Sequence, residues 1–464
     1  MGAAQFIFIL LLFITFFWAY RKYSELIQAI FLAKPVKIKG PFSKRFKNTL
    51  LVAFGQKKMF KRILPAVFHL FIYVAFLITQ IKIIEILIDG VTGSHRIFAE
   101  PLGGFYTFVV SSIEVLSVLA FVATIVFLWR RNLFIVPRFK NAEMTSWPRL
   151  DANIILWAEM VLLIGIFSYN GADVVLQGRE IAGYPDTGPL LVSTLIGPAL
   201  LGGLETSTLH VIERFGWWLH IIAVLGFIVY LPYSKHLHIF FAFPNTFFAK
   251  LKPRGEMENM PEIMNEVKSM MGLGGDSGEA VDMEEIPEFG SKDIFDLDRI
   301  NILGAYSCTE CGRCTAVCPA NITGKKLSPR KIVMDIRDRS EEVIAKLKSG
   351  KEEYIREDLR GEGTSLSAEN FDDGKTLFDY ISPEELHACT TCNACVEACP
   401  VLIDPLEPIL KMRRYEILTQ SAGPSDWMPM FTSLENNGSP WQMSDSRDAW
   451  REELEGEGEN KNEE

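Results

Sequence analysis

Residues 308–319 read CTECGRCTAVCP and residues 389–400 read CTTCNACVEACP, and these two runs contain all 8 cysteines of the chain. Each run has the spacing Cys-x2-Cys-x2-Cys-x3-Cys-Pro, which bacterial ferredoxins use to bind [4Fe–4S] clusters. Zinc is the alternative metal, but a tetrahedral zinc site uses paired Cys-x2-Cys arms and leaves the x3-Cys-Pro ends unexplained. The runs therefore predict two [4Fe–4S] clusters.

The spacing also predicts how the eight thiolates are shared. In this pattern the first three cysteines of a run bind one cluster, and the fourth turns away toward the other cluster. We therefore expect the first cluster on Cys308, Cys311, Cys314 and Cys399. We expect the second cluster on Cys389, Cys392, Cys395 and Cys318.

The segment between the two runs is far longer than in a compact two-cluster ferredoxin. Residues 328–350 (SPRKIVMDIRDRSEEVIAKLKSG) have apolar side chains at helical spacing, a Ser-Pro start and a glycine end. Further helices are expected near 383–390 and from 408 to 418. The pattern indicates a mainly helical cluster domain over residues 301–420.

Charge divides the 464-residue chain into two halves. Residues 1–250 contain 23 Lys and Arg against 13 Asp and Glu, whereas the remainder contains 24 against 44. A basic apolar half followed by an acidic polar half indicates a membrane domain joined to a soluble domain. The acidic half argues against nucleic-acid binding, which requires a basic surface.

Five apolar segments are long enough to cross the hydrocarbon layer, which takes roughly 20 residues. They cover about 5–19, 63–88, 105–128, 151–170 and 214–234. The first lacks the preceding charge and clear cleavage site of a secretory signal, so we expect it to be retained. A sixth stretch, 190–204, is short and rich in Gly and Pro, and we expect it to be interfacial or re-entrant on the outer side.

The loops predict the orientation of these helices. Residues 20–62 carry twelve Lys and Arg against one acid, and residues 129–150 carry five against one. The loops near 89–104 and 171–213 are mildly acidic. Since basic loops stay in the cytoplasm, the N-terminus is expected outside and the cluster domain in the cytoplasm.

Histidines in the apolar half suggest a second cofactor. His220 and His238 are eighteen residues apart, which is five turns of a continuous helix and about 27 Å along its axis. His69, on the second apolar segment, is expected at the depth of His238. Two neutral imidazoles on different helices can bind a haem iron from both sides, so His69 and His238 are candidate haem b ligands. The alternative is a pair of interfacial histidines with local hydrogen bonds. His236 is expected to point elsewhere.

The role of His220 is open. A second haem would need a partner about ten residues beyond His69, and Thr79, which cannot bind iron, occupies that position. His220 is therefore a candidate for a second haem site, for a quinone pocket or for a hydrogen bond to a neighbouring helix.

The stretch WLHIIAVLGFIVYLPYSKHLHIF (218–240) resembles the last helix of the respiratory nitrate reductase gamma subunit family. In that family the two histidines of this helix each bind a b-type haem, with partners on helix two. The resemblance implies that His238 and His69 bind the haem nearest the cytoplasmic electron partner. His220 would correspond to the outer haem, where Thr79 replaces the second ligand. The resemblance covers about residues 1–245.

Two further segments complete the chain. Residues 246–300 are acidic and rich in Gly and Pro, and we expect a flexible tether with one short amphipathic helix near 260–271. Residues 421–464 are expected to be irregular, with a disordered acidic end. Segment 434–450 (LENNGSPWQMSDSRDAW) resembles the connector of heterodisulfide-reductase-like Fe–S oxidoreductases, which precedes a catalytic domain with Cys-Cys-Gly motifs. The chain contains no Cys-Cys-Gly motif, so the resemblance implies a separate cytoplasmic subunit that carries one.

Together these patterns predict an all-α protein: a five-helix transmembrane bundle followed by a mainly helical two-cluster ferredoxin domain, as in the iron–sulfur subunits of succinate dehydrogenase. The arrangement resembles heterodisulfide-reductase-like and electron-transfer-flavoprotein:quinone oxidoreductases. It implies an electron-transfer subunit in a bacterial or archaeal cytoplasmic membrane, with lipid, quinone and a catalytic subunit or electron-transfer flavoprotein as partners. Whether the chain is itself an enzyme stays open, because no phosphate loop, dinucleotide fingerprint or nucleophile motif is present. The alternatives are a redox-sensing or scaffold membrane protein and a zinc-stabilised adaptor.

Overall fold

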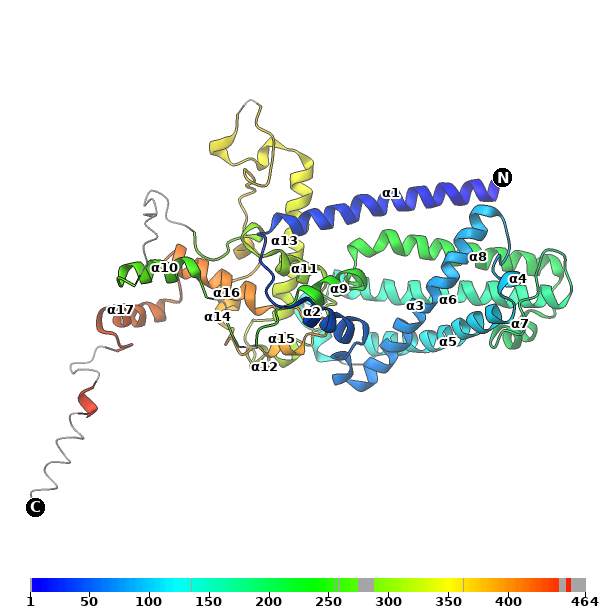
Figure 1. The fold of residues 1–464 in the computed structure, drawn as a ribbon, viewed down its shortest axis with the longest axis horizontal. Helices are drawn as coiled ribbons and strands as arrows, with labels where there is room; N and C mark the ends of the chain where they lie inside the picture. The colour runs from blue at the N-terminus through cyan, green and yellow to red at the C-terminus, as the bar shows by residue number, and fades with distance from the viewer. Residues whose placement is uncertain are drawn as a thin grey trace, which may run out of the picture.

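The computed structural model describes residues 2–134, 136–253, 255–257, 259–273, 288–361, 363–441 and 448–451. In these ranges the chain is helical, and its only β-type pairings are two isolated bridges. The predicted all-α class is therefore confirmed, with an apolar bundle at the N-terminal side and a helical domain that contains both cysteine runs after it (Figure 1).

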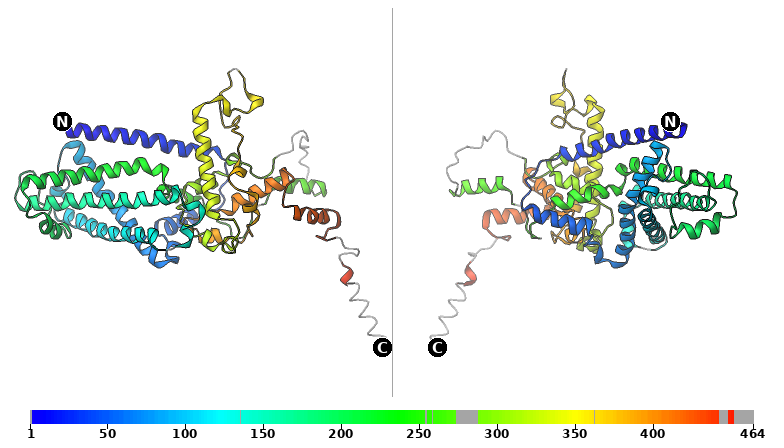
Figure 2. Two further views of the ribbon diagram at one scale, coloured as in Figure 1. Left: turned by 180° about the vertical axis from the view of Figure 1, so that it is seen from behind. Right: turned by 45° about the vertical axis from the view of Figure 1, so that its right-hand side comes forward.

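Within the described residues, five helices are long and apolar enough to cross a membrane. They are α1 (Ala3–Leu32), α3 (Ile63–Thr92), α5 (Gly104–Asn132), α6 (Trp147–Gly178) and α8 (Thr206–Tyr230). The five predicted spans are thus confirmed, although each helix is longer than its apolar segment. Helix α1 extends farthest beyond its prediction, and both views in Figure 2 show it running along the bundle to the cluster domain.

Short helices close both ends of the bundle. At the end nearest the cluster domain lie α2 (Phe42–Asn48), which continues as a π-helical turn over Thr49–Phe54, and α9 (His238–Phe248). At the opposite end, called the distal end here, lie α4 (Ala99–Leu102) and α7 (Ser193–Leu201) (Figure 1). Helix α7 is the sixth apolar stretch of the sequence. It is too short to span a membrane and packs on α6, as expected for an interfacial piece.

The expected straight helix through His220 and His238 is wrong. Helix α8 ends at Tyr230, and two 3₁₀ turns follow over Leu231–Leu237 before α9 begins at His238. Pro232 lacks the N–H that a continuous helix needs, and Ser234 is extended with φ −116° and ψ 152°. The Ser234 hydroxyl accepts a hydrogen bond from the His236 amide, which stabilises the break.

The cluster domain consists of short helices around one long helix. The short helices are α11 (Arg299–Tyr306), α12 (Pro319–Ile322), α14 (Pro383–His387), α15 (Ala394–Ala398) and α16 (Leu406–Arg414). The long helix α13 (Pro329–Ser349) begins where Ser328 caps the Lys331 amide and ends at Gly350, whose φ is +63°. These are the start and stop that the sequence predicted.

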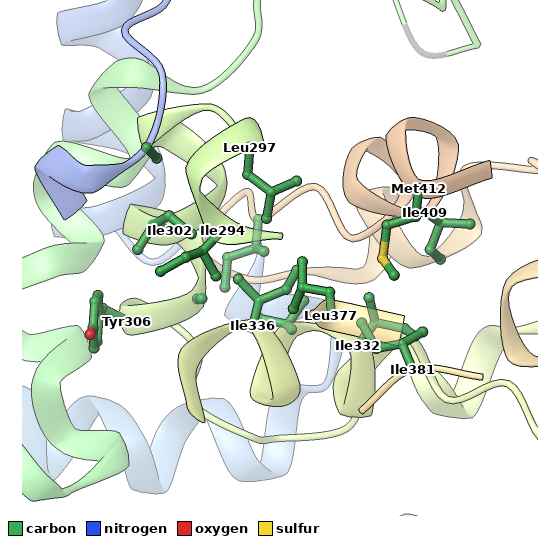
Figure 3. Close-up of a cluster of buried hydrophobic side chains, with 14 of the residues drawn as sticks. Ile294, Leu297, Ile302, Tyr306, Ile332, Ile336, Leu377, Ile381, Ile409 and Met412 are labelled. Carbon is green, nitrogen blue, oxygen red and sulfur yellow. The ribbon is translucent and has the colours of Figure 1, made fainter. Parts of the chain in front are cut away.

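The apolar core of this domain also contains side chains from the membrane domain. Figure 3 shows Ile332 and Ile336 of α13 facing Leu377, Ile381 and side chains from α16. Residues Leu26, Ala29 and Ala33 from the end of α1 belong to the same core. The Lys34 amide donates to Leu297 O (2.8 Å), and the Arg299 amide donates to Lys34 O (3.0 Å).

Direct packing, and not only a tether, therefore joins the two domains. The expected tether 246–300 contains the predicted amphipathic helix as α10 (Pro261–Met270), and residues 274–287 lie outside the described residues. From residue 288 the chain already belongs to the cluster domain, because the Phe289 amide donates to Thr419 Oγ1 (2.8 Å) and the Ser291 amide donates to Lys411 O (3.0 Å).

The expected irregular tail is partly wrong. After residue 421 a helix, α17, covers Met428–Asn437, and the Trp427 ring packs on His387 with ring centres 4.8 Å apart. The resembling segment 434–450 is only partly described, and the acidic end from residue 452 onward lies outside the described residues.

A buried ion cluster links α13 to the segments around it. The Arg339 side chain is fully buried and donates to Asp293 Oδ1 (3.1 Å), to Asp373 Oδ2 (2.6 Å) and to Lys375 O (2.7 Å). Burial alone would raise the pKa of the Asp373 carboxyl. The hydrogen bonds and the positive charge of Arg339 instead help to lower this pKa to about 2.

Arg339→Met should destabilise the cluster domain by about 3–5 kcal/mol, because it leaves the buried Asp293 without its cation and leaves Asp373 with Lys346 alone. The measurement is the shift in the chemical unfolding midpoint, followed by the cluster absorbance. Arg356→Met is the matched control: its pair with Asp358 is exposed, and we expect a change within about 0.5 kcal/mol. Equal shifts in both variants would contradict the assignment.

Candidate redox site

The two cysteine runs meet in the fold, and the fourth cysteine of each run lies beside cysteines of the other run. The thiols of the first group lie near enough to interact electrostatically: Cys308, Cys311, Cys314 and Cys399. Cys399 reaches this group because α15 ends at Ala398 and turns the chain back toward the first run. Cys399 is buried, and its Sγ accepts a hydrogen bond from the Ile403 amide (3.2 Å).

The second group forms on the other side of the same core. A small cavity of about 20 Å³ is lined by its four thiols, namely Cys318, Cys389, Cys392 and Cys395. Cys318 lies just before α12, where Pro319 redirects the chain. Cys392 is exposed, whereas Cys318 and Cys395 are buried. This group therefore has one edge open to solvent.

The thiols lie in surroundings that disfavour the free thiolate. Burial raises the pKa of Cys308 and of Cys395 to about 12, and that of Cys399 to about 11. At neutral pH these groups stay protonated until iron displaces the protons. Among the described residues, no three His, Cys, Asp or Glu side chains converge closely enough to hold one metal ion. A four-iron cluster is larger than a single ion, and its thiolates therefore stand farther apart.

An apolar cavity of about 370 Å³ lies between the first cysteine group and the membrane helices. His69, His236 and His238 line it together with Tyr73 and Phe76, and Cys311, Arg313 and Val401 line its other end. Its volume falls within the usual range for ligand pockets, and its walls are mainly apolar. The structure thus places the two candidate haem ligands in one cavity, next to the first cysteine group.

The hydrogen bonds of these histidines suit metal binding. His238 Nδ1 lies 3.1 Å from Lys235 O, a carbonyl that can only accept, so Nδ1 carries the proton and Nε2 keeps its lone pair. His69 Nδ1 lies 3.1 Å from Gln56 Oε1 in the turn that follows the π-helical segment. Metal-binding histidines commonly donate their other ring N–H in this way, so the residues present fit a haem held by two imidazoles.

The expectation that His236 points elsewhere is wrong. His236 also lines the cavity, and its ring centre lies 5.3 Å from that of His238. The break before α9 allows this, because His236 lies in the 3₁₀ turn Lys235–Leu237 and does not share a straight helix with His238. His236 Nδ1 is buried and has no hydrogen-bond partner among the described residues.

His220 lies apart from this cavity. It is fully buried, and its Nδ1 donates to Leu162 O of α6 (3.0 Å). Its Nε2 has no hydrogen-bond partner within the described residues. Of the three roles left open by the sequence, the structure supplies the hydrogen bond to a neighbouring helix.

Sequence reasoning missed an ion pair that connects the segment before His238, a candidate haem ligand, to the first cysteine run. Lys235 Nζ donates to Glu310, which lies between Cys308 and Cys311 and is 3% exposed. The Glu310 amide donates to Cys308 Sγ (3.4 Å), and Arg337 donates to the Glu310 carboxylate (3.0 Å). No local sequence signal predicts the ion pair of Glu310. Its backbone, with a φ of +51°, takes this conformation only in the folded cysteine run.

Glu310→Gln should raise the reduction potential of the first cluster by on the order of 50 mV, because it removes a buried negative charge beside the sulfurs. Potentiometric titration followed by EPR measures this potential. Glu384→Gln, at an exposed pair with Lys326, is the control and should leave both cluster potentials unchanged. A lowered potential in the Glu310 variant would contradict the argument.

Comparison with known proteins identifies the cluster domain. Residues 307–403 match the family of 4Fe-4S dicluster domains. This range begins one residue before Cys308 and ends four residues after Cys399, so the family spans both cysteine runs. It supports iron–sulfur clusters and disfavours the zinc-stabilised adaptor. No solved structure matches the chain.

Three curated proteins are similar to the chain. A probable iron-sulfur-binding oxidoreductase, FadF, from Bacillus subtilis is 28% identical over 89% of this chain and 56% of its own length. The EtfAB:quinone oxidoreductase of Syntrophomonas wolfei is 26% identical over 89% of this chain and 54% of its own. A probable membrane-anchored ferredoxin from Chromohalobacter salexigens is 33% identical over 29% of this chain and 19% of its own. The chain thus spans about half the length of the first two relatives. These similarities support electron transport by a membrane-bound iron–sulfur protein of oxidoreductase type.

Proposed function

We propose that this chain transfers electrons between a soluble partner and the quinone pool, using two [4Fe–4S] clusters and one haem b. The observation that carries the proposal is the shared cavity: His69 and His238 line one part of it, and Cys311 lines another. A haem in this cavity would supply a one-electron carrier beside the first cluster. The protein provides ligation, spacing and an apolar environment.

The partners follow from the two ends of this arrangement. The exposed Cys392 edge of the second cysteine group is where a soluble donor or acceptor would approach. One relative is named an EtfAB:quinone oxidoreductase, which favours an electron-transfer flavoprotein, a Cys-Cys-Gly-type catalytic subunit being the other candidate. The basic loops favour a position of the cluster domain in the cytoplasm of a bacterium or archaeon, and quinone would react from the membrane.

The first test is the haem and iron content of the detergent-purified chain, followed by quinone oxidation. We expect one haem b per chain by pyridine haemochrome and eight irons for two clusters. Chemically reduced clusters should be reoxidised by a menaquinone analogue within the mixing time of a stopped-flow experiment. Clusters that stay reduced in the presence of quinone would favour the redox-sensing alternative and overturn the proposal.

A further inference from the structure

Four arginines line the cavity between the membrane helices and the first cysteine group, and they are called the arginine cluster here. Its members are Arg130, Arg131, Arg138 and Arg313. Arg130 and Arg131 belong to the last turn of α5, Arg138 to the 3₁₀ turn Pro137–Phe139, and Arg313 to the first cysteine run. Three separate segments of the chain thus bring positive charge to one cavity.

The members of the arginine cluster lie close together. The guanidinium carbons of Arg131 and Arg138 lie 5.3 Å and 4.9 Å from the centre of the same aromatic ring, that of Phe139. Arg138 also lies near enough to Arg130 and Arg313 for their positive charges to repel one another. Like charges at such distances are unfavourable unless an opposite charge offsets them.

No carboxylate of the described residues offsets these charges. None of the described residues that line the cavity is Asp or Glu, and no member of the arginine cluster forms an ion pair with any described carboxylate. Lys235 lines the same cavity and differs in this respect, because it pairs with Glu310. The positive charge of the cavity is therefore concentrated on the arginine cluster.

The hydrogen bonds of the arginine cluster leave N–H groups available for a ligand. Arg131 Nη2 donates to Pro148 O (2.9 Å), and Arg138 Nε donates to Cys311 O (2.9 Å). The buried Nε of Arg131 has no acceptor among the described residues, and Arg130 has no hydrogen bond to any of them. Because a buried donor without an acceptor is unfavourable, these groups suit an anionic ligand.

The cavity is basic at one end and apolar at the other. Arg138 lies at the end beside Cys311, whereas Phe76 and Leu77 of α3 line the end among the membrane helices. Phe76 lies seven residues beyond His69, which is about 10 Å along the axis of α3. A ligand that fits has an apolar body, a group that binds imidazole, and negative charge on one edge. Haem b has all three features.

We propose that the arginine cluster binds the carboxylates of the two haem propionates. The inference rests on the proposed function and deepens it, because it names the residues that orient the same haem. The propionate edge of the haem then faces the first cysteine group, and the edge without carboxylates faces Phe76. An anionic lipid offers related chemistry, with a phosphate in place of the carboxylates, but it would leave His69 and His238 without a ligand.

Haem with esterified propionates tests the assignment. The detergent-purified full chain is prepared from haem-deficient cells and titrated with haem b and with haem b dimethyl ester, and the Soret absorbance gives the affinities. The ester has the same iron and ring but no carboxylates, so we expect it to bind at least about tenfold more weakly. Equal affinities would overturn the inference and leave the proposed function intact. Absence of binding by both haems would overturn both proposals.

Replacement of one arginine separates direct contact from a structural effect. Arg130→Gln should bind haem b about tenfold more weakly and should bind the ester as the wild type does, because the lost interaction needs a carboxylate. Arg149→Gln is the matched control, since Arg149 lies in the same basic loop, is exposed and does not line the cavity. Equal weakening of haem b and ester in Arg130→Gln would overturn the inference.

The iron content and the bound lipid of each variant complete the test. Two clusters per chain show that a variant is folded, and if Arg130→Gln loses its clusters, Arg131→Gln takes its place. Phosphatidylglycerol is measured in the purified proteins by mass spectrometry, and we expect equal amounts in the wild type and the variant. If this lipid is lost from the variant while haem b still binds with wild-type affinity, the arginine cluster is a lipid site and the inference is overturned.

Discussion

Replacing Cys399 by alanine is expected to remove the cluster of the first cysteine run, although Cys399 belongs to the second run. The reason is the predicted exchange of fourth cysteines, which agrees with the position of Cys399, buried beside Cys308, Cys311 and Cys314. The iron content should fall to about half, and one of the two EPR signals of the reduced protein should be lost. Iron and acid-labile sulfide analysis together with EPR measure this outcome.

Pairs of variants make the test independent of which signal belongs to which cluster. Cys308→Ala and Cys399→Ala should leave the same residual spectrum, and Cys389→Ala and Cys318→Ala should leave the other. If Cys399→Ala instead shares its spectrum with Cys389→Ala, each run binds its own cluster and the exchange is refuted. The surviving cluster reports that the domain is folded, which matters because cluster binding and folding are coupled.

The sequence could predict those parts of the fold that depend on short stretches of chain. The caps of α13 are an example, because Ser328, Pro329 and Gly350 act on their own helix ends. The five long helices follow from the length of the apolar segments alone. The spacing of each run likewise predicts the exchange of the fourth cysteines, and this ligand assignment stays a prediction.

Features that arise from contacts between distant segments could not be predicted. Asp151, from another helix of the bundle, stabilises the break after α8. Its carboxylate accepts hydrogen bonds from the Lys235 amide (3.1 Å) and the Tyr230 hydroxyl (2.7 Å). Because this contact has no local sequence signal, the sequence predicted a straight helix. A straight helix directs His236 away from the cavity, so its position there could not be predicted. The buried ion pairs at the distal end were missed for the same reason, because partners such as Arg96 and Asp173 come from segments far apart in the chain.

The direct packing of the two domains also changes what the site can do. A tethered cluster domain would meet the membrane cofactor only transiently. In the structure the ion pair between Lys235 and Glu310 is buried, and the end of α1 is part of the cluster-domain core. The cavity and the first cysteine group are therefore held at a fixed separation, which suits repeated one-electron transfer.

Replacing His238 by alanine is expected to abolish haem b binding, whereas His236→Ala should retain it. Both histidines line the cavity, but only His238 has Nδ1 fixed by a carbonyl so that Nε2 keeps its lone pair for iron. His69→Ala should match His238→Ala, because a haem that depends on two imidazoles is not retained when either one is removed. Gln56→Ala, which frees His69 Nδ1, should weaken haem retention by about 10–100-fold.

The haem content per chain by pyridine haemochrome, with the low-spin EPR signal, distinguishes these ligands. His387→Ala is the matched control, since His387 pairs with Glu416 in the cluster domain and does not line the cavity. Loss of haem in His236→Ala with retention in His238→Ala would make His236 the ligand and leave His238 to support it. Loss of haem in both variants, with the control intact, would mean that one imidazole binds the iron and the other stabilises the 3₁₀ turn that positions the ligand. That turn also carries Lys235, so loss of haem in both variants predicts a shifted potential of the first cluster in His236→Ala. Loss of haem in His236→Ala alone predicts no such shift.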